Sequence, residues 1–143
     1  MRSLGVKIVH LQLINKIDDP TVEKYGDHIH VTKGSEGAKI IEEFLNEHDI
    51  IVEKNKDSGF FETELDKDLK ELGIESVIVT GMQTQICVQT TAADAFFRGY
   101  KVIVPRDGVV STKEEDKTRA LEWLENYFAE ITTCDEICNY LII

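Results

Sequence analysis

Long hydrophobic runs are missing from this sequence. No stretch reaches the ~18 consecutive apolar residues from which a membrane-spanning helix is built. Residues 1–10 also lack the apolar core and the small-residue cleavage site that mark a secretory signal peptide. These absences predict a cytoplasmic protein without a membrane partner.

Cysteine and positive charge are both scarce. The three cysteines, Cys87, Cys134 and Cys138, do not form a disulfide framework, and their odd number leaves at least one free thiol. Lysine and arginine number 16 against 27 aspartates and glutamates, which gives a formal net charge of −11. Because affinity for nucleic acid depends largely on basic side chains that release counterions, this balance argues against a nucleic-acid partner.

The remaining composition is that of a soluble globular protein. Apolar residues make up 42% and charged residues 30% of the 143 residues, which suits one domain with its own core. We therefore expect a single domain over residues 1–143, in which apolar strands alternate with amphipathic helices. The expected strands are residues 6–14, 50–52, 76–80, 101–105 and 130–131, and the expected helices are 38–47, 65–72, 85–98 and 114–128, followed by a terminal turn. This alternation predicts an α/β fold, a three-layer α/β/α sandwich around a mainly parallel, Rossmann-like sheet.

Parallel sheets of this kind place their sites beyond the carboxyl ends of the strands, where loops lead into helices. Here that rule selects residues 54–60, 81–87 and 106–112. Cys87 lies near the start of the helix expected at 85–98, where the helix dipole favours a thiolate and therefore a nucleophile. On position alone, a small residue packed between helix and sheet remains an alternative explanation of Cys87.

A long pattern surrounds Cys87. Residues 79–88 read Val-Thr-Gly-Met-Gln-Thr-Gln-Ile-Cys-Val, and a helix rich in threonine and alanine follows, with an Asp-Ala pair at Asp94. After Gly-Tyr, the next strand leads to Asp107. The whole run, without a gap, resembles the signature of the isochorismatase-like cysteine hydrolases. We expect Asp94 and Asp107 to have structural roles, by capping or hydrogen bonding.

Two upstream segments extend the resemblance. Residues 49–65 are similar to the lysine segment of that family, in which a lysine precedes a phenylalanine by six residues. That spacing assigns the role of the lysine to Lys54 rather than to Lys56. Residues 34–41, which begin Gly-Ser-Glu-Gly-Ala, are similar to the segment that precedes the lysine. The resemblance therefore extends from residue 34 to the C-terminus.

The resemblance implies a reaction and a set of site residues. Cys87 would attack a small amide or ureido carbonyl and cleave its C–N bond through a thioester, while Lys54 keeps the site positive. No cofactor is expected, and the partner would be a small-molecule amide substrate. The resemblance places the oxyanion hole at a cis peptide bond between Met82 and Gln83 and at the amide of Cys87, and it places Phe60 in the substrate pocket.

The sequence departs from the family pattern at its beginning. In that family the catalytic aspartate ends a first strand, and no such strand precedes Leu4. We therefore expect that the chain lacks the family's first strand and helix, and that the sheet has a gap where the central strand would lie. His10 is expected at a strand end without a catalytic role, and Asp18 or Asp19 could approach the site from a loop.

Several alternatives stay open. A nicotinamidase is one, because His30 lies where those enzymes carry a metal-binding histidine; a single histidine makes no metal site, so we predict no metal. A non-catalytic relative that lost the aspartate is another. Cys134 and Cys138, four residues apart, could form a redox pair or half a metal site, or could be buried thiols. Because members of this family commonly assemble, a homo-oligomer is expected.

Overall fold

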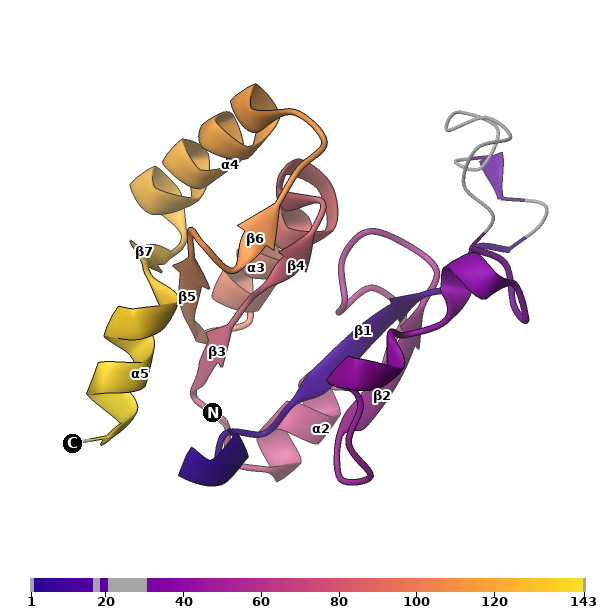
Figure 1. Ribbon diagram of the computed structural model, residues 1–143, viewed down its shortest axis with the longest axis horizontal. Helices are drawn as coiled ribbons and strands as arrows, with labels where there is room; N and C mark the ends of the chain where they lie inside the picture. The colour runs from indigo at the N-terminus through magenta and orange to yellow at the C-terminus, as the bar shows by residue number, and fades with distance from the viewer. Residues whose placement is uncertain (1, 17–18, 21–30, 143) are drawn as a thin grey trace.

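The computed structural model describes residues 2–16, 19–20 and 31–142 (Figure 1). The described strands are β1 (Val9–Leu13), β2 (Ile50–Lys54), β3 (Ser76–Ile78), β4 (Gly81–Met82), β5 (Lys101–Pro105), β6 (Val109–Val110) and β7 (Glu130–Thr132). The described α-helices are α2 (Leu65–Glu71), α3 (Gln89–Phe97), α4 (Glu114–Tyr127) and α5 (Cys134–Ile142). The 3-10 turns are η1 (Arg2–Leu4), η3 (Glu36–Ala38) and η4 (Glu42–Phe44), and a π-helical turn, η5 (Thr84–Val88), leads into α3.

Every described strand pair is parallel, as the alternation of strands and helices predicts. β1 pairs with β2, β5 lies between β3 and β7, and β4 pairs with β6. These pairs form three separate ladders, and in the described part of the chain no strand pairing joins β1–β2 to β3–β5–β7. Figure 1 shows the two larger ladders side by side, with α4 and α5 beside the second one. The α/β class with parallel strands is confirmed.

The core lies where α3 packs against β5 and where α4 packs against α3 and β7. In β5, Val102 and Val104 are buried, whereas Lys101 is exposed and Ile103 is half-buried, so one face of this strand is buried. Leu124 of α4 is 0% exposed, and Ala92 and Ala95 let α3 approach the sheet closely. The same apolar cluster continues through Val88 to Val52 and Phe60 of the β1–β2 side, so side chains connect the ladders that strand pairing leaves separate.

Two predicted helix boundaries are confirmed by their glycines. α2 ends before Gly73, which has φ 68°, and α3 ends before Gly99, which has φ 93°. A positive φ costs glycine little, because it has no Cβ, so these residues can reverse the chain direction after a helix.

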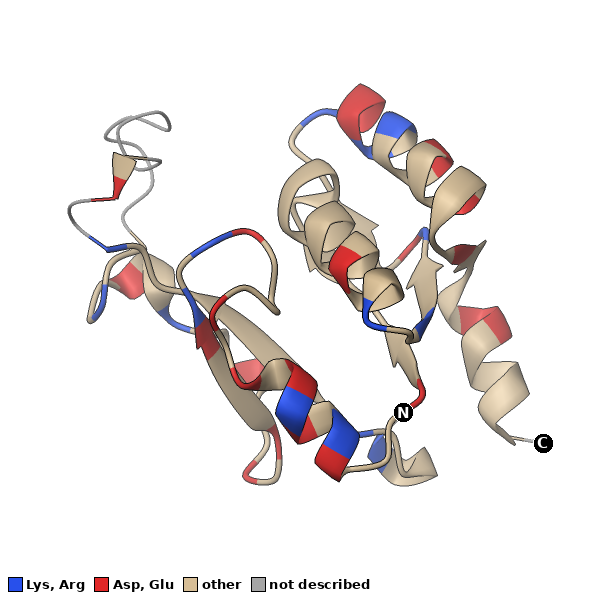
Figure 2. Ribbon diagram, turned by 180° about the vertical axis from the view of Figure 1, so that it is seen from behind, with Lys and Arg blue, Asp and Glu red and all other residues tan. Residues whose placement is uncertain are grey.

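On α2, Lys70 pairs with Asp66 one turn earlier at 2.7 Å, and Figure 2 shows the alternating charges on that helix.

Several details of the predicted fold are wrong, and one of them is the strand expected at 76–80, which ends at Ile78. The helix expected at residues 38–47 is replaced by the turns η3 and η4, where Ile41 and Phe44 are exposed; a short helix needs an apolar face packed against the protein, and these side chains have none. The terminal turn is the nine-residue helix α5. The strand expected at 6–14 is limited to Val9–Leu13, so His10 lies inside it rather than at its end. None of the described helices is long and apolar enough to span a lipid bilayer.

Candidate active site

Lys54 and Cys87 meet at the carboxyl ends of β2 and β4. Lys54 is the last residue of β2, and only 4% of its surface is exposed. Its Nζ donates hydrogen bonds of 2.9 Å to the carbonyl oxygens of Lys56 and Asp57, and it lies 3.4 Å from Cys87 Sγ. Two carbonyls and the sulfur thus surround a buried ammonium group. An ammonium this close to sulfur stabilises a thiolate.

Cys87 lies in the π-helical turn η5, between β4 and α3. We expected it about two residues into an α-helix; instead the helix begins with five residues in π geometry, a form that often occurs at functional sites. The Met82–Gln83 peptide bond just before this turn is cis, as the resemblance implies. Cys87 is half-buried.

Residues 106–112 complete the same edge of the structure. The side-chain oxygen of Gln83 accepts a hydrogen bond from the Thr112 amide at 2.9 Å, and that of Gln85 accepts one from Ser111 Oγ at 2.7 Å. These bonds hold the loop after β6 against η5. The three segments that the strand-end rule selects are therefore adjacent.

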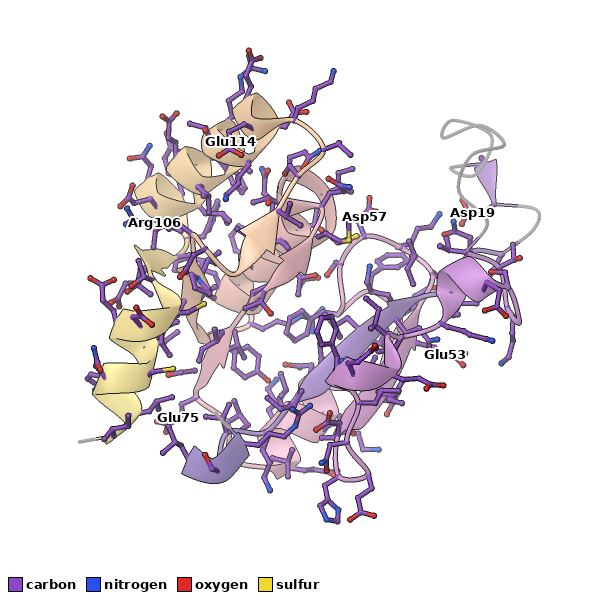
Figure 3. All side chains as sticks on the ribbon, viewed as in Figure 1. Asp19, Glu53, Asp57, Glu75, Arg106 and Glu114 are labelled. Carbon is purple, nitrogen blue, oxygen red and sulfur yellow. The ribbon has the colours of Figure 1, made fainter. Side chains whose placement is uncertain are left out.

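Asp57 is a site residue that sequence reasoning missed. Its Oδ1 lies 3.9 Å from Cys87 Sγ, within reach of a weak S–H···O contact. Asp57 is in the loop between β2 and α2, labelled in Figure 3. The only signal for it in the sequence is its place within residues 54–60, one of the three segments at strand ends.

Side chains of α3 hold this loop in place. The Gly59 amide donates to Thr91 Oγ1 at 3.0 Å, and Ser58 Oγ donates to Asp94 Oδ2 at 2.7 Å. Asp94 also accepts from Arg98 at 2.8 Å, which agrees with the structural role predicted for it. At Gly59 an added Cβ would collide with a methyl group of Leu11, so the loop backbone packs directly on β1.

Phe60 lies in the core. It is 5% exposed, its ring stacks on Tyr100 with centroids 5.9 Å apart, and the Arg98 guanidinium lies 5.1 Å from the ring centre. Burial, together with the hydrogen bond to Asp66, raises the pKa of Tyr100 to about 12. Neither cavity described below is lined by Phe60. Its place in a substrate pocket stays a prediction.

Four other candidates were named from the sequence, and the structure describes two of them, Asp19 and His10. His30 and Asp18 are outside the described residues. Asp19 accepts hydrogen bonds from Lys56 Nζ at 2.6 and 2.8 Å, and so Lys54 and Lys56 have different partners. His10 Nε2 lies 2.9 Å from Asp49, which also binds Arg2, so His10 has a structural partner.

The C-terminal cysteines form a separate cluster. The amide of Cys134 donates to Asp107 Oδ1 at 2.9 Å, which agrees with the structural role predicted for Asp107 and lowers the pKa of this carboxyl. Burial, and then the neighbouring Asp107, raise the pKa of the Cys134 thiol. Cys138 is half-buried. Across the described ranges, no group of three or more histidine, cysteine or acidic side chains is arranged to hold a metal ion.

Two cavities lie near the site, and Cys87 lines neither of them. The larger, of about 570 Å³, opens at the carboxyl ends of β1 and β2 and is lined by Ile14, Asn15, Lys16, Thr32, Lys33, Glu53, Lys54 and Asn55. The second, of about 350 Å³, lies over α3 between Ser58 and Trp123. The larger cavity reaches Lys54, and its volume is in the range of small-molecule sites.

The fold and the site define an α/β protein with a candidate nucleophilic cysteine beside a buried lysine. Residues 1–136 match the family model of the Isochorismatase domain, and the chain therefore belongs to the isochorismatase family. It is 43% identical over 90 residues to the uncharacterized isochorismatase family protein YaaI of Bacillus subtilis, a match that covers 62% of this chain and 50% of that protein.

Two further similarities concern proteins with named activities. The chain is 33% identical over 115 residues to Nicotinamidase 3 of Arabidopsis thaliana, covering 78% of this chain and 58% of that protein. The structure of N-carbamoylsarcosine amidase from Thermoplasma acidophilum superimposes with a TM-score of 0.83 at 31% identity, covering 92% of this chain and 75% of the other. The chain thus spans 50% of the length of the first of these curated relatives and 58% of the second.

Proposed function

We propose that this chain carries the nucleophile site of a cysteine hydrolase that cleaves the C–N bond of a small amide or ureido compound. The observation that carries the proposal is the 3.4 Å distance between Lys54 Nζ and Cys87 Sγ. A buried ammonium group at that distance favours the thiolate, which is the nucleophilic form of cysteine.

In the proposed reaction, Cys87 Sγ attacks the substrate carbonyl carbon. The tetrahedral oxyanion accepts hydrogen bonds from the N–H of the Met82–Gln83 peptide and from the Cys87 amide. Collapse of this intermediate releases the amine or ammonia and leaves a thioester on Cys87. Water then hydrolyses the thioester and restores the thiol.

The relatives support the substrate class, and the larger cavity, which reaches Lys54 but not Cys87, agrees with it. Asn15, Asn55, Lys16 and Lys33 give the cavity polar and cationic walls, which suit a polar substrate of few atoms. The names of two relatives, a nicotinamidase and an N-carbamoylsarcosine amidase, denote enzymes of amide and ureido compounds. Both facts support a small amide or ureido substrate.

The test is release of ammonia or amine from a panel of small amides and ureido acids by the purified chain. Cys87→Ser should abolish turnover, whereas Cys138→Ser should leave it unchanged. Rapid quenching followed by intact mass measurement should detect an acyl group on the peptide that contains Cys87. Turnover by Cys87→Ser equal to that of the parent chain would reject the proposal.

A nicotinamidase is the second candidate, favoured by the 33% identity to Nicotinamidase 3. Deamidation of nicotinamide that stops with a chelator and returns with Zn²⁺ would support it over a metal-free amidase. If a folded chain hydrolyses no compound of the panel, the non-catalytic alternative replaces both. We also propose that the chain forms a homo-oligomer. Light scattering of the purified chain would measure its molar mass in solution.

A further inference from the structure

The second cavity, of about 350 Å³, is lined by two exposed aromatic residues from different helices. Phe97 of α3 is 74% exposed, and Trp123 of α4 is 37% exposed. We propose that this cavity binds a small organic cation of the quaternary ammonium class that also carries a hydroxyl group. The inference goes beyond the proposed hydrolase function and does not depend on it.

The two aromatic residues pack on opposite sides of a third ring. The ring centroid of Phe128 lies 5.4 Å from that of Phe97 and 4.6 Å from that of Trp123. Among the residues that the structure describes, no ring contact joins Phe97 to Trp123, although both line the cavity. An aromatic ring attracts a cation that lies within about 6 Å of its centre, and several rings around one space recognise quaternary ammonium groups. The space between these two rings is therefore suited to such a group.

The charge of the lining also favours a cation. Asp94 is the one charged side chain among the described residues that line the cavity, and 29% of this side chain is exposed. Hydrogen bonds from Ser58 Oγ at 2.7 Å and from Arg98 Nε at 2.8 Å hold its carboxylate in place. Arg98 offsets part of this charge locally, but the whole chain has a net charge of −11, which attracts cations and repels anions.

The lining offers a polar partner to the ligand as well. Gln89 lines the cavity one turn of α3 before Ala93, and its side-chain amide forms no hydrogen bond within the described part of the chain. An amide has both donors and an acceptor, so it can bind a hydroxyl group in either direction. A hydroxyalkyl ammonium compound combines the cation that the rings favour with the hydroxyl that Gln89 can bind.

This cavity lies beside the residues that position Cys87 and is not lined by Cys87 itself. Ser58, which lines it, follows Asp57 in the loop after β2, and Asp57 Oδ1 lies 3.9 Å from Cys87 Sγ. Thr90, which also lines it, donates a hydrogen bond to the Cys87 carbonyl at 3.3 Å. A ligand in this cavity would thus contact neighbours of the nucleophile without reaching the sulfur, which is the position of an effector and not of a substrate.

The chain carries its own reporter for the test, because Trp123 is its single tryptophan. Its fluorescence is titrated with choline and with the neutral carbon analogue of choline, in which a tert-butyl group replaces the trimethylammonium group, at equal ionic strength. Choline should change the fluorescence in a saturable manner and should bind at least ~10-fold more tightly than the analogue, because only the cation is attracted by the rings and by Asp94. Equal affinities of the two compounds, or no saturable change with choline, would overturn the proposal.

Two substitutions of exposed aromatic residues test the location. Phe97→Leu should weaken choline binding by about 2–30-fold, which is the contribution of one cation–π contact. Tyr127→Leu is the matched control, because Tyr127 is 63% exposed on α4 but does not line the cavity, and it should leave the affinity unchanged. Equal effects of the two substitutions would reject the assigned cavity.

A second measurement does not depend on Phe97→Leu or on fluorescence. Saturation-transfer NMR follows the methyl protons of choline in the presence of the parent chain and of Trp123→Leu, and circular dichroism confirms that each protein is folded. The transfer signal should be clear with the parent chain and should largely disappear with Trp123→Leu. An undiminished signal with folded Trp123→Leu would place choline elsewhere on the chain and would contradict the proposal.

Discussion

Thr91 offers the sharpest test of how the site is built. This buried residue of α3 accepts a hydrogen bond from the Gly59 amide at 3.0 Å and contacts the Asp57 carbonyl at 3.5 Å. Thr91→Val replaces the hydroxyl with a methyl group of nearly the same volume. The substitution therefore removes the acceptor without leaving a cavity.

The expected loss follows from the buried donor that remains. Gly59 is buried, so its N–H would have neither Thr91 nor bulk water as a partner. A buried donor without a partner costs about 1–3 kcal/mol. In a chain of this size each kcal/mol lowers the melting temperature by about 4 °C, which predicts a decrease of about 4–12 °C.

The neighbouring threonine supplies the control. Thr90 is exposed, and its hydroxyl donates to the carbonyl oxygens of Ile86 and Cys87 at 2.7 and 3.3 Å. In Thr90→Val these carbonyls still have helix amides and water, so stability should change by less than ~0.5 kcal/mol. Thermal unfolding followed by circular dichroism measures both variants. Equal melting temperatures for Thr90→Val and Thr91→Val would refute the argument that this bond holds the loop.

Three further predictions concern charge and packing. The Arg2 guanidinium holds the pKa of Asp49 well below its usual range. The stability that Asp49 contributes is therefore present above about pH 3.9 and is lost as pH falls through the lowered pKa. In urea unfolding between pH 2 and 7, the difference in free energy of unfolding between the parent and Asp49→Asn should shrink as pH falls below about 3.9. Lys54→Met should slow alkylation of Cys87 at pH 7.5 by at least ~10-fold because the thiolate loses its ammonium partner, whereas Lys56→Met should not. Leu124→Ala should lower the free energy of unfolding by about 2–5 kcal/mol, since it empties a fully buried position, and the exposed Ile142→Ala should cost far less in the same denaturant titration.

The regular elements were predictable where local signals agreed. At residues 101–105 the apolar run follows a glycine, and the strand has the predicted bounds. α5 had a usable signal that was missed: Thr133 and Glu136 exchange hydrogen bonds of 3.2 and 2.9 Å, which is a capping box at the start of a helix. The helix expected at 38–47 failed because a helical stripe predicts a helix only if the rest of the chain covers that stripe.

The site was predictable only in part. The family signature and the strand-end rule both pointed to Cys87 and Lys54, and the two side chains are in contact. Asp57 has only its place in a strand-end segment as a signal, because its contact with Cys87 joins residues 30 positions apart through an irregular loop. The conformation of that loop depends on bonds to Thr91 and Asp94, and no periodic pattern in the sequence encodes them.

The separate ladders couple ligand binding to folding. Lys54 is the last residue of β2 in the β1–β2 ladder, and Cys87 follows β4 of the β4–β6 ladder. A ligand that contacts both residues would therefore connect two ladders that strand pairing does not join. Such a ligand binds the folded state alone and stabilises it by about 2.7 kcal/mol at a concentration of 100 Kd. Substrates, products and inhibitors of this chain should therefore reveal themselves by raising its melting temperature, before any reaction has been assigned.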